Sequence, residues 1–238
     1  MKIVTWNCNG ALRKKFENLS DLKADIYIIQ ECENPAQTRH QEYINWAGNH
    51  LWIGDNKNKG LGIFAAEHLT IEHLNWSNTY QDHTVKHFLP SLINKDFQLI
   101  GIWTHQNNSH NFGYIGQLWK YLQVNSLSLK KVIIAGDFNS NAIWDQWDRW
   151  WNHSDVVRDL SELDINSLYH KHLKEEHGKE SKPTYFMNRK PERPYHIDYV
   201  FGSREFSDTL TNVQIGDSTH WLKISDHLPM ICDFELKH

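Results

Sequence analysis

Polar side chains that could bind a metal or move a proton stand at or near the ends of short apolar segments along this 238-residue chain. They are Asn7, Glu31, His105, Asp137, Asn139, Asp198, Asp226 and His227. Carboxylate and amide oxygens suit hard divalent cations, and an imidazole beside a carboxylate can transfer a proton or stabilise negative charge. Strand ends hold such groups on a rigid sheet. The pattern therefore predicts that these residues form one site.

Most of these motifs also have an ordinary structural explanation. Asn7 and the Gly-Asp-Phe-Asn segment at 136–139 could belong to turns, and Glu31 could be a loop carboxylate. Asp198 is different, because a carboxylate within an apolar segment needs a partner or a metal to offset the cost of its burial. The Ser-Asp-His-Leu-Pro sequence at 225–229 is also unusual, since it places a carboxylate next to an imidazole.

The elements that position these residues are short segments rich in β-branched and aromatic residues, which favour strands. The predicted strands are residues 3–6, 26–29, 62–65, 99–104, 132–135, 197–201 and 230–234. A hairpin is predicted between residues 87–93 and 98–103, with its turn at Asp96. The predicted helices are residues 16–22, 115–124 and 156–163. Strands with intermittent helices and no linker predict an α/β or α+β fold, with residues 1–238 forming one domain.

The composition indicates a folded protein, because 39% of the residues are hydrophobic and 13% are aromatic. The formal net charge of −4 argues against binding nucleic acid by overall charge alone, although it is compatible with a local basic groove. Three cysteines are too few for a disulfide framework, and we interpret them as buried thiols. The chain opens without a charged leader and has no apolar stretch of membrane-span length. We therefore expect a soluble, cytoplasmic protein.

Taken together, the motifs resemble those of the endonuclease/exonuclease/phosphatase superfamily. In chain order they are Asn7 after the first strand, Gln30-Glu31 after the second, Gly-Asp-Phe-Asn at 136–139, Asp198 in a late strand, and Ser-Asp-His at 225–227. The resemblance extends from residue 7 to residue 227. It implies a DNase I-like four-layer architecture, a sandwich of two mostly antiparallel β-sheets flanked by helices, with the site at one end.

The resemblance also implies a metal site in a phosphoesterase. Glu31 would be the principal ligand of Mg²⁺ or Mn²⁺, hard cations that take few carboxylates and keep several waters. Asp226, with Asn7 or Asn9, would complete the metal shell directly or through water. A carboxylate at a strand end without a neighbouring Cys/His cluster also favours Mg²⁺ or Mn²⁺ over zinc.

The catalytic roles follow from the same resemblance. His227, oriented by Asp198, would stabilise charge on a phosphoryl oxygen. Asp137 would orient or deprotonate the attacking water, and Asn139 would donate a hydrogen bond to the phosphate. His105 would contact phosphate or protonate the leaving group.

The N-terminal motif Asn-Cys-Asn-Gly followed by Arg13 resembles exonuclease III and related abasic-site endonucleases. That branch carries a Tyr in an Asn-x-Tyr-x-Pro-Asn pattern, whereas this chain has His105, which is closer to the DNase I and sphingomyelinase-like branches. Asn107 or Asn108 is a further candidate for phosphate contact. The resemblance therefore favours phosphodiester hydrolysis more strongly than abasic-site cleavage.

Basic and aromatic residues near the predicted site strands could bind substrate. Arg13 follows the first motif, and Arg189 and Arg193 precede the Asp198 strand, so they could form a track for phosphates. Trp144 opens a tryptophan-rich segment, 144–151, that could stack on bases. Alternatively, this segment is a helix that packs one tryptophan face on the protein body, and the basic residues are a solvated surface.

These observations predict a nuclease that acts on DNA or RNA. The alternatives are a phosphatase or phosphodiesterase for a small molecule or lipid headgroup, which the acidic net charge favours, and a non-catalytic binding module. The last is disfavoured because Glu31, Asp137 and His227 are all retained. The sequence does not indicate the oligomeric state.

Overall fold

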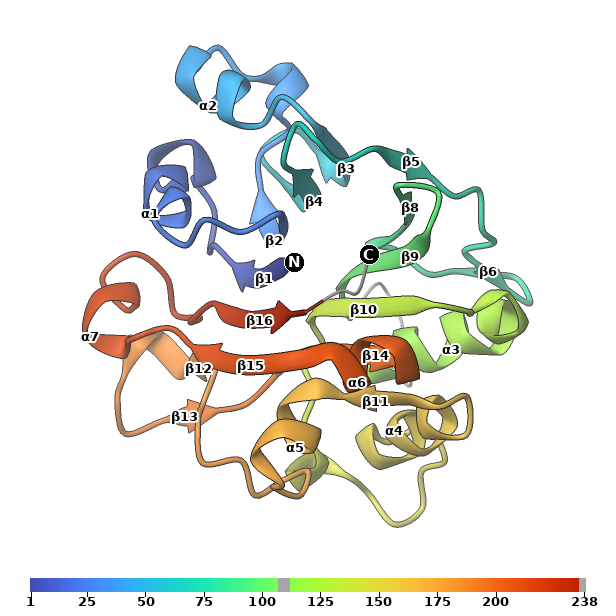
Figure 1. The fold of residues 1–238 in the computed structure, drawn as a ribbon. Coiled ribbons are helices and arrows are strands. Elements are labelled where there is room, and N and C mark those ends of the chain that lie inside the picture. The colour runs from blue at the N-terminus through green and yellow to red at the C-terminus, as the bar shows by residue number, and fades with distance from the viewer. Residues whose placement is uncertain (107–111, 236–238) are drawn as a thin grey trace.

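The computed structural model describes residues 1–106 and 112–235, which form two six-stranded sheets and flanking helices (Figure 1). The first sheet has the strand order β15-β16-β1-β2-β4-β3. Its strands are β1 Lys2–Asn7, β2 Ile26–Cys32, β3 His50–Asn56, β4 Lys59–Ala65, β15 Leu210–Ile215 and β16 Met230–Phe234. β1 and β2 pair in parallel, and the other neighbours pair antiparallel.

The second sheet has the strand order β11-β14-β10-β9-β8-β5. Its strands are β5 Ile71–His73, β8 Phe88–Ile93, β9 Phe97–Trp103, β10 Val132–Asp137, β11 Ile165–Ser167 and β14 Asp198–Ser203. β9 and β10 pair in parallel, and the other neighbours pair antiparallel. Two short ribbons are formed by β6 Thr79–Tyr80 with β7 His83–Thr84 and by β12 Tyr185–Phe186 with β13 Pro194–Tyr195.

Helices flank the two sheets (Figure 1). They are α1 Phe16–Ser20, α2 Gln41–Trp46, α3 Ile115–Asn125, α4 His153–Ser161, α5 Leu168–Leu173, α6 Arg204–Thr209 and α7 Ser218–Trp221. Short 3-10 turns lie at Leu12–Lys14, Pro35–Gln37, Ser126–Ser128, Ala142–Trp144 and Met187–Arg189. Residues of α1, α2 and α7 pack on the first sheet, and residues of α3 and α4 pack on the second. Within the described ranges, no helix has the length and apolar character needed to cross a membrane.

The central strands are apolar on both faces because each face is covered. Ile28 and Ile133 point into the core between the two sheets. Their neighbours Ile29 and Ile134 point outward, against the helices of the first and second sheet respectively. Successive side chains of a strand alternate between its faces, so this burial yields four layers: helices, sheet, sheet, helices. The predicted fold class and four-layer architecture are confirmed.

The predicted hairpin is also confirmed. Its strands are β8 and β9, and the pair nearest the turn is Ile93 opposite Phe97. Three residues, 94–96, connect the strands. Asn94 and Lys95 both have positive φ, 51° and 54°, and the backbone N–H of Asp96 donates to the carbonyl of Ile93 at 2.8 Å, as in a turn that matches the sheet twist. The three cysteines are buried free thiols, as predicted.

The helix suggested for residues 144–151 is wrong, because the segment is helical only in the 3-10 turn Ala142–Trp144. Oδ1 of Asn152 accepts hydrogen bonds from the Gln146 backbone N–H (3.0 Å) and from Nε of Arg149 (2.7 Å). Side-chain bonds of this kind replace helical ones. They leave Trp147 98% exposed, so the tryptophans do not pack as one face on the body.

Candidate active site

Asn7, Asp137 and Asp198 meet where the two sheets lie against each other at one end of the sandwich. Asp137 ends β10, Asp198 begins the antiparallel β14, and the two residues are directly opposite in register. Asn7 ends β1 of the first sheet, and its Nδ2 donates to Oδ2 of Asp137 at 2.9 Å. The strand ends of both sheets therefore supply one buried polar cluster.

His227 completes this cluster. Its Nδ1 lies 2.9 Å from Oδ2 of Asp198, and ligand atoms of Asp137, Asp198 and His227 all lie within 4.8 Å of one another. The three side chains are almost entirely buried, and among the described residues Oδ1 of Asp198 has no hydrogen-bond partner. The backbone N–H of Asp198 donates to Oγ1 of Thr184 at 3.0 Å, which fixes the start of β14.

The Ser-Asp-His turn is tied to the first strand, which explains why His227 lies beside residues far away in sequence. Oγ of Ser225 donates to the backbone carbonyl of Asn7 at 2.7 Å and accepts from the backbone N–H of His227 at 3.1 Å. Nε1 of Trp6 donates to the carbonyl of His227 at 2.9 Å. The backbone N–H and the backbone carbonyl of His227 are therefore both held by hydrogen bonds.

Burial and neighbouring charges shift the pKa values of this cluster. Burial raises the pKa of Asp137 to about 7, with Asp198 acting in the same direction and His227 opposing it. Burial lowers the pKa of His227, but Asp198, Asp137 and Asp226 outweigh it and raise that pKa to about 9. At neutral pH the site thus holds an imidazolium beside a carboxyl group that can gain or lose a proton.

Asp137 is oriented by three donors. The backbone N–H and Nδ2 of Asn139 donate to its two oxygens at 2.8 and 3.0 Å, in addition to the bond from Asn7. Asn139 has φ of 43°, a left-handed conformation that Asn tolerates well. At Gly136, with φ of 152°, a Cβ would lie 1.8 Å from the carbonyl oxygen of Ile102, so only glycine fits.

The second hydrogen on Nδ2 of Asn139 faces the carbonyl oxygen of Thr104 at 3.1 Å. Both amide hydrogens are therefore engaged within the protein, and the predicted donation to phosphate stays a prediction that requires a change of partner.

Glu31 lies beyond the cluster at a bulge in β2, where it adopts φ of 61°. Its carboxylate pairs with Nζ of Lys59 on β4 at 3.0 Å, and its side chain is 18% exposed. Burial raises the pKa of Tyr185, and the carboxylates of Asp226, Asp137 and Glu31 raise it further. These three carboxylates are therefore all near the Tyr185 hydroxyl. Lys59 carries no sequence signal that distinguishes it from an ordinary surface lysine.

The remaining predicted residues are more peripheral. Oδ1 of Asn7 accepts from the backbone N–H of Asn9 at 3.0 Å, while Asn9 itself is exposed. His105 is exposed after β9, where its ring lies 5.5 Å from Trp103; within the described ranges no hydrogen bond or ion pair links its side chain to the cluster. Asn107 and Asn108 lie outside the described residues.

The predicted basic residues differ in their pairing. Arg13 forms an ion pair with the buried Glu33, so its charge is already balanced. Arg189 contacts only backbone carbonyls, at 3.4 and 3.5 Å, and Arg193 lies near a methionine sulfur. Among the described residues, neither of these two arginines has a carboxylate partner. Arg189 and Arg193 thus have charges available for an anion.

A row of aromatic rings leads from the cluster to the surface. The ring centroids of His227 and Tyr185 are 4.6 Å apart. Those of Tyr185 and Tyr195 are 6.3 Å apart, and those of Tyr195 and Trp144 are 5.2 Å apart. Trp144 is 43% exposed. Trp144 is a candidate from the sequence, but the two tyrosines are not, because they become neighbours only when β12 and β13 pair.

Known proteins with the same fold include nucleases. The AP endonuclease from Archaeoglobus fulgidus is 18% identical with a TM-score of 0.72, covering 99% of this chain and 100% of that chain. The 3'-5' exonuclease NExo from Neisseria meningitidis is 18% identical with a TM-score of 0.70 and the same coverage. A structure of the Neisseria 3' phosphatase NExo bound to a product DNA hairpin has a TM-score of 0.71, again at 18% identity, covering 99% of this chain and 100% of that chain.

A search of curated proteins found no match. At the sequence level, the model of the Endonuclease/Exonuclease/phosphatase family matches residues 4–227, a range that contains every motif residue of the cluster. With this match and this strand-end geometry, the chain belongs to the Endonuclease/Exonuclease/phosphatase family of hydrolases.

Proposed function

We propose that residues 1–238 form one catalytic unit that hydrolyses phosphodiester bonds of DNA or RNA with Mg²⁺ or Mn²⁺. The observation that carries the proposal is the aromatic row from His227 to the exposed Trp144. Stacking surfaces suit the bases of a nucleic acid, whereas a compact phosphoester needs no such row. The nuclease and DNA-bound neighbours support the same substrate class.

The side chains that we assign to the metal carry the oxygen donors that a hard divalent cation prefers. Glu31, Asp226 and Asn7 offer oxygen atoms, and the ammonium of Lys59 already lies 3.0 Å from Glu31, so this carboxylate attracts a cation. We assign Glu31 as the principal ligand, completed by Asp226 with Asn7 or Asn9. When bound, the metal supplies Lewis-acid polarisation of the phosphoryl group.

The buried cluster performs the proton chemistry. Asp137, whose pKa is about 7, accepts the proton of the attacking water, since a base titrating near neutral pH combines availability with driving force. His227, charged at neutral pH, stabilises the negative charge that develops on the phosphoryl oxygens. Asp198 holds Nδ1 of this ring and directs Nε2 toward the substrate. Asn139 positions Asp137 and donates to phosphate, and His105 protonates the leaving group.

The substrate is held outside the cluster. Trp144 stacks on a base, and Arg189 and Arg193 contact backbone phosphates, because their charges are not balanced by carboxylates among the described residues. Asn107 and Asn108 stay candidates for phosphate contact. Arg13 contributes less, since Glu33 already balances its charge.

A substrate panel tests the proposal. Labelled single- and double-stranded DNA and RNA oligonucleotides, p-nitrophenyl phosphate and a lipid phosphodiester are incubated with the protein and Mg²⁺ or Mn²⁺. The proposal expects cleavage of at least one oligonucleotide at a kcat/KM far above that for the small esters. Turnover of a small ester or lipid headgroup alone would establish the second candidate, which the net charge of −4 favours. No turnover of any substrate would indicate a binding module.

A further inference from the structure

Four histidines and a glutamate form a second polar cluster, which the proposed catalytic chemistry does not use. We call it the histidine cluster: His153, His170, His177, Glu180 and His196. Its rings are close, with centroid distances of 3.5 Å between His170 and His177 and 5.2 Å between His153 and His177. His153 and His196 are almost fully buried, and Nε2 of His196 has no hydrogen-bond partner among the described residues.

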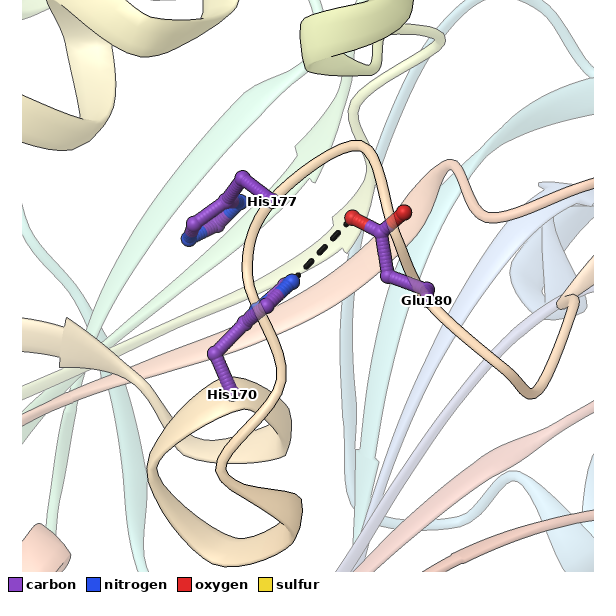
Figure 2. Close-up of side chains that lie close together, drawn as sticks. All are labelled: His170, His177 and Glu180. Carbon is purple, nitrogen blue, oxygen red and sulfur yellow. Dashed lines mark hydrogen bonds and ion pairs between the residues drawn. The ribbon is translucent and has the colours of Figure 1, made fainter.

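Three members of the histidine cluster converge like metal ligands (Figure 2). His170 comes from α5, and His177 and Glu180 come from the loop that follows it. One ligand atom from each of the three residues lies within 4.8 Å of the other two. Nε2 of His170 lies 3.1 Å from Oε1 of Glu180. A cation could replace the proton of this hydrogen bond.

The charges in the cluster suit a cation. The side chains of His170 and Glu180 are 8% and 4% exposed. The backbone N–H of Gly178 donates to Oε1 of Glu180 at 3.0 Å, and Nδ2 of Asn141 donates to Oε2 at 3.1 Å. These bonds hold the buried carboxylate beside the imidazole rings, where a cation would balance its charge.

The second nitrogen of each ring is already held by a partner. Nδ1 of His170 lies 2.7 Å from Oγ of Ser167, and Nδ1 of His177 lies 3.1 Å from Nε2 of His153. Nδ1 of His153 is in turn 3.3 Å from Oγ of Ser140. Metal-binding histidines are commonly oriented by such a bond from the other ring nitrogen. These partners leave the Nε2 atoms of His170 and His177 as the ligand atoms.

We propose that His170, His177 and Glu180 bind a second divalent cation, Zn²⁺, at a site separate from the catalytic centre. Two imidazoles and one carboxylate are a zinc ligand set, whereas Mg²⁺ prefers oxygen alone. The cation lies near the plane of each imidazole, so the stacked rings, 17° from parallel, must turn on binding. The proposal therefore requires the loop that carries His177 to shift and its bond to His153 to lengthen or change partner. A pocket of about 420 Å³, lined by both histidines, provides an entry path.

The cation would fix the loop that connects α5 to β12. Residues 174–184 contain no helix or strand, and Glu180 ties them to α5 and to Asn141. The loop ends at Thr184, whose Oγ1 accepts from the backbone N–H of Asp198 and whose carbonyl accepts from that of Leu228 at 2.7 Å. A metal that binds these residues only in the folded protein stabilises this loop and the scaffold on which the catalytic strand begins.

Cobalt provides the direct test, because Co²⁺ replaces Zn²⁺ and absorbs visible light when nitrogen ligands bind it. The 238-residue protein is freed of metal with a chelator and titrated with Co²⁺ and then Zn²⁺, in four forms: wild type, Glu31→Gln, His177→Ala and Glu180→Gln. We expect one Co²⁺ per chain to give a visible band that Zn²⁺ abolishes, besides any Co²⁺ that the oxygen ligands of the catalytic centre bind. Affinity should persist in Glu31→Gln and fall at least about 10-fold in His177→Ala and in Glu180→Gln.

Thermal unfolding gives a second readout with a matched control, His172→Ala, which removes an exposed histidine of α5. At saturating Zn²⁺ the melting temperature should rise by about 5 °C or more in wild type and His172→Ala, but not in His177→Ala. Three results would overturn the proposal: no Co²⁺ bound by wild type, binding lost only in Glu31→Gln, or binding unchanged in His177→Ala and Glu180→Gln. If His177→Ala does not fold, the wild-type, Glu31→Gln and Glu180→Gln titrations still decide.

Discussion

Nδ1 of His227 lies 2.9 Å from Oδ2 of Asp198, and both side chains are buried. Asp198 begins β14 of the second sheet, whereas His227 lies in the turn before β16 of the first. The bond sets the ring orientation and, together with the other nearby carboxylates, raises the pKa of His227. The pair therefore behaves as one functional unit.

Removing either member should cost nearly as much as removing both. Asp198→Asn and His227→Ala should each lower kcat by about 100-fold or more, the scale for losing one oriented charge-stabilising group. The double variant should be little worse than the more damaging single one. Single-turnover rates of the three variants give the coupling free energy between the two residues. If the fold-loss of the double variant equals the product of the two single fold-losses, the residues act independently.

Lys59 should compete with the metal for Glu31, because its Nζ lies 3.0 Å from that carboxylate. Lys59→Met should lower the Mn²⁺ concentration at half-saturation about two- to fivefold, in line with the small energy of a partly exposed ion pair. Mn²⁺ binding followed by electron paramagnetic resonance measures this without turnover. Lys57→Met, an exposed lysine of the same hairpin, is the control. Weaker Mn²⁺ binding in Lys59→Met would mean that the ammonium supports the metal site instead.

Neutralising Arg189 and Arg193 together with Lys190, the exposed lysine next to Arg189, should raise KM for oligonucleotides and leave a small chromogenic phosphodiester nearly unaffected. Each phosphate-binding cation that is removed should reduce the slope of log K against log salt by about one. Arg204→Gln is the matched control, since Arg204 follows the end of β14 opposite to Asp198. Equal effects of the triple variant on both substrates would contradict the proposed phosphate track.

Acid should destabilise the protein through His87, whose pKa burial lowers from 6.5 to about 4. Between these two pH values the unfolded chain binds a proton that the folded chain does not, so stability falls as pH falls. The slope from this residue reaches about 1.4 kcal/mol per pH unit. Urea unfolding of wild type and His87→Gln between about pH 7 and pH 4.5 should show a shallower loss in the variant. The exposed His83→Gln should match wild type, and identical slopes in all three proteins would refute the assignment.

The sequence predicted the fold well where one signal dominated. Residues 132–135 are apolar throughout because β10 is buried on both faces, and Asp137 at its end is visible as the first polar group. It failed at residues 144–151, because the spacing of the tryptophans mimics a helix while Asn152 captures the backbone of the segment. It also failed to link the histidines, since His170 and His177 become neighbours only when α5 and the loop fold together.

Pairing partners were harder to predict than strand ends. Asp198 clearly needed a partner, and the family pattern pointed to His227, but nothing in the sequence revealed the ion pair between Lys59 and Glu31 or that between Arg13 and Glu33. These contacts depend on neighbouring strands and loops, whose register is set by the packing of the whole sheet.

Cleavage of an end-labelled oligonucleotide after metal removal and add-back tests the central claim most directly. Wild type should lose activity in excess EDTA and regain it with Mg²⁺ or Mn²⁺. Glu31→Gln should stay at least about 100-fold slower at any accessible metal concentration, and Glu42→Gln, an exposed carboxylate on α2, should match wild type. Full turnover in EDTA, or a wild-type rate in Glu31→Gln, would contradict a metal-dependent nuclease built around Glu31.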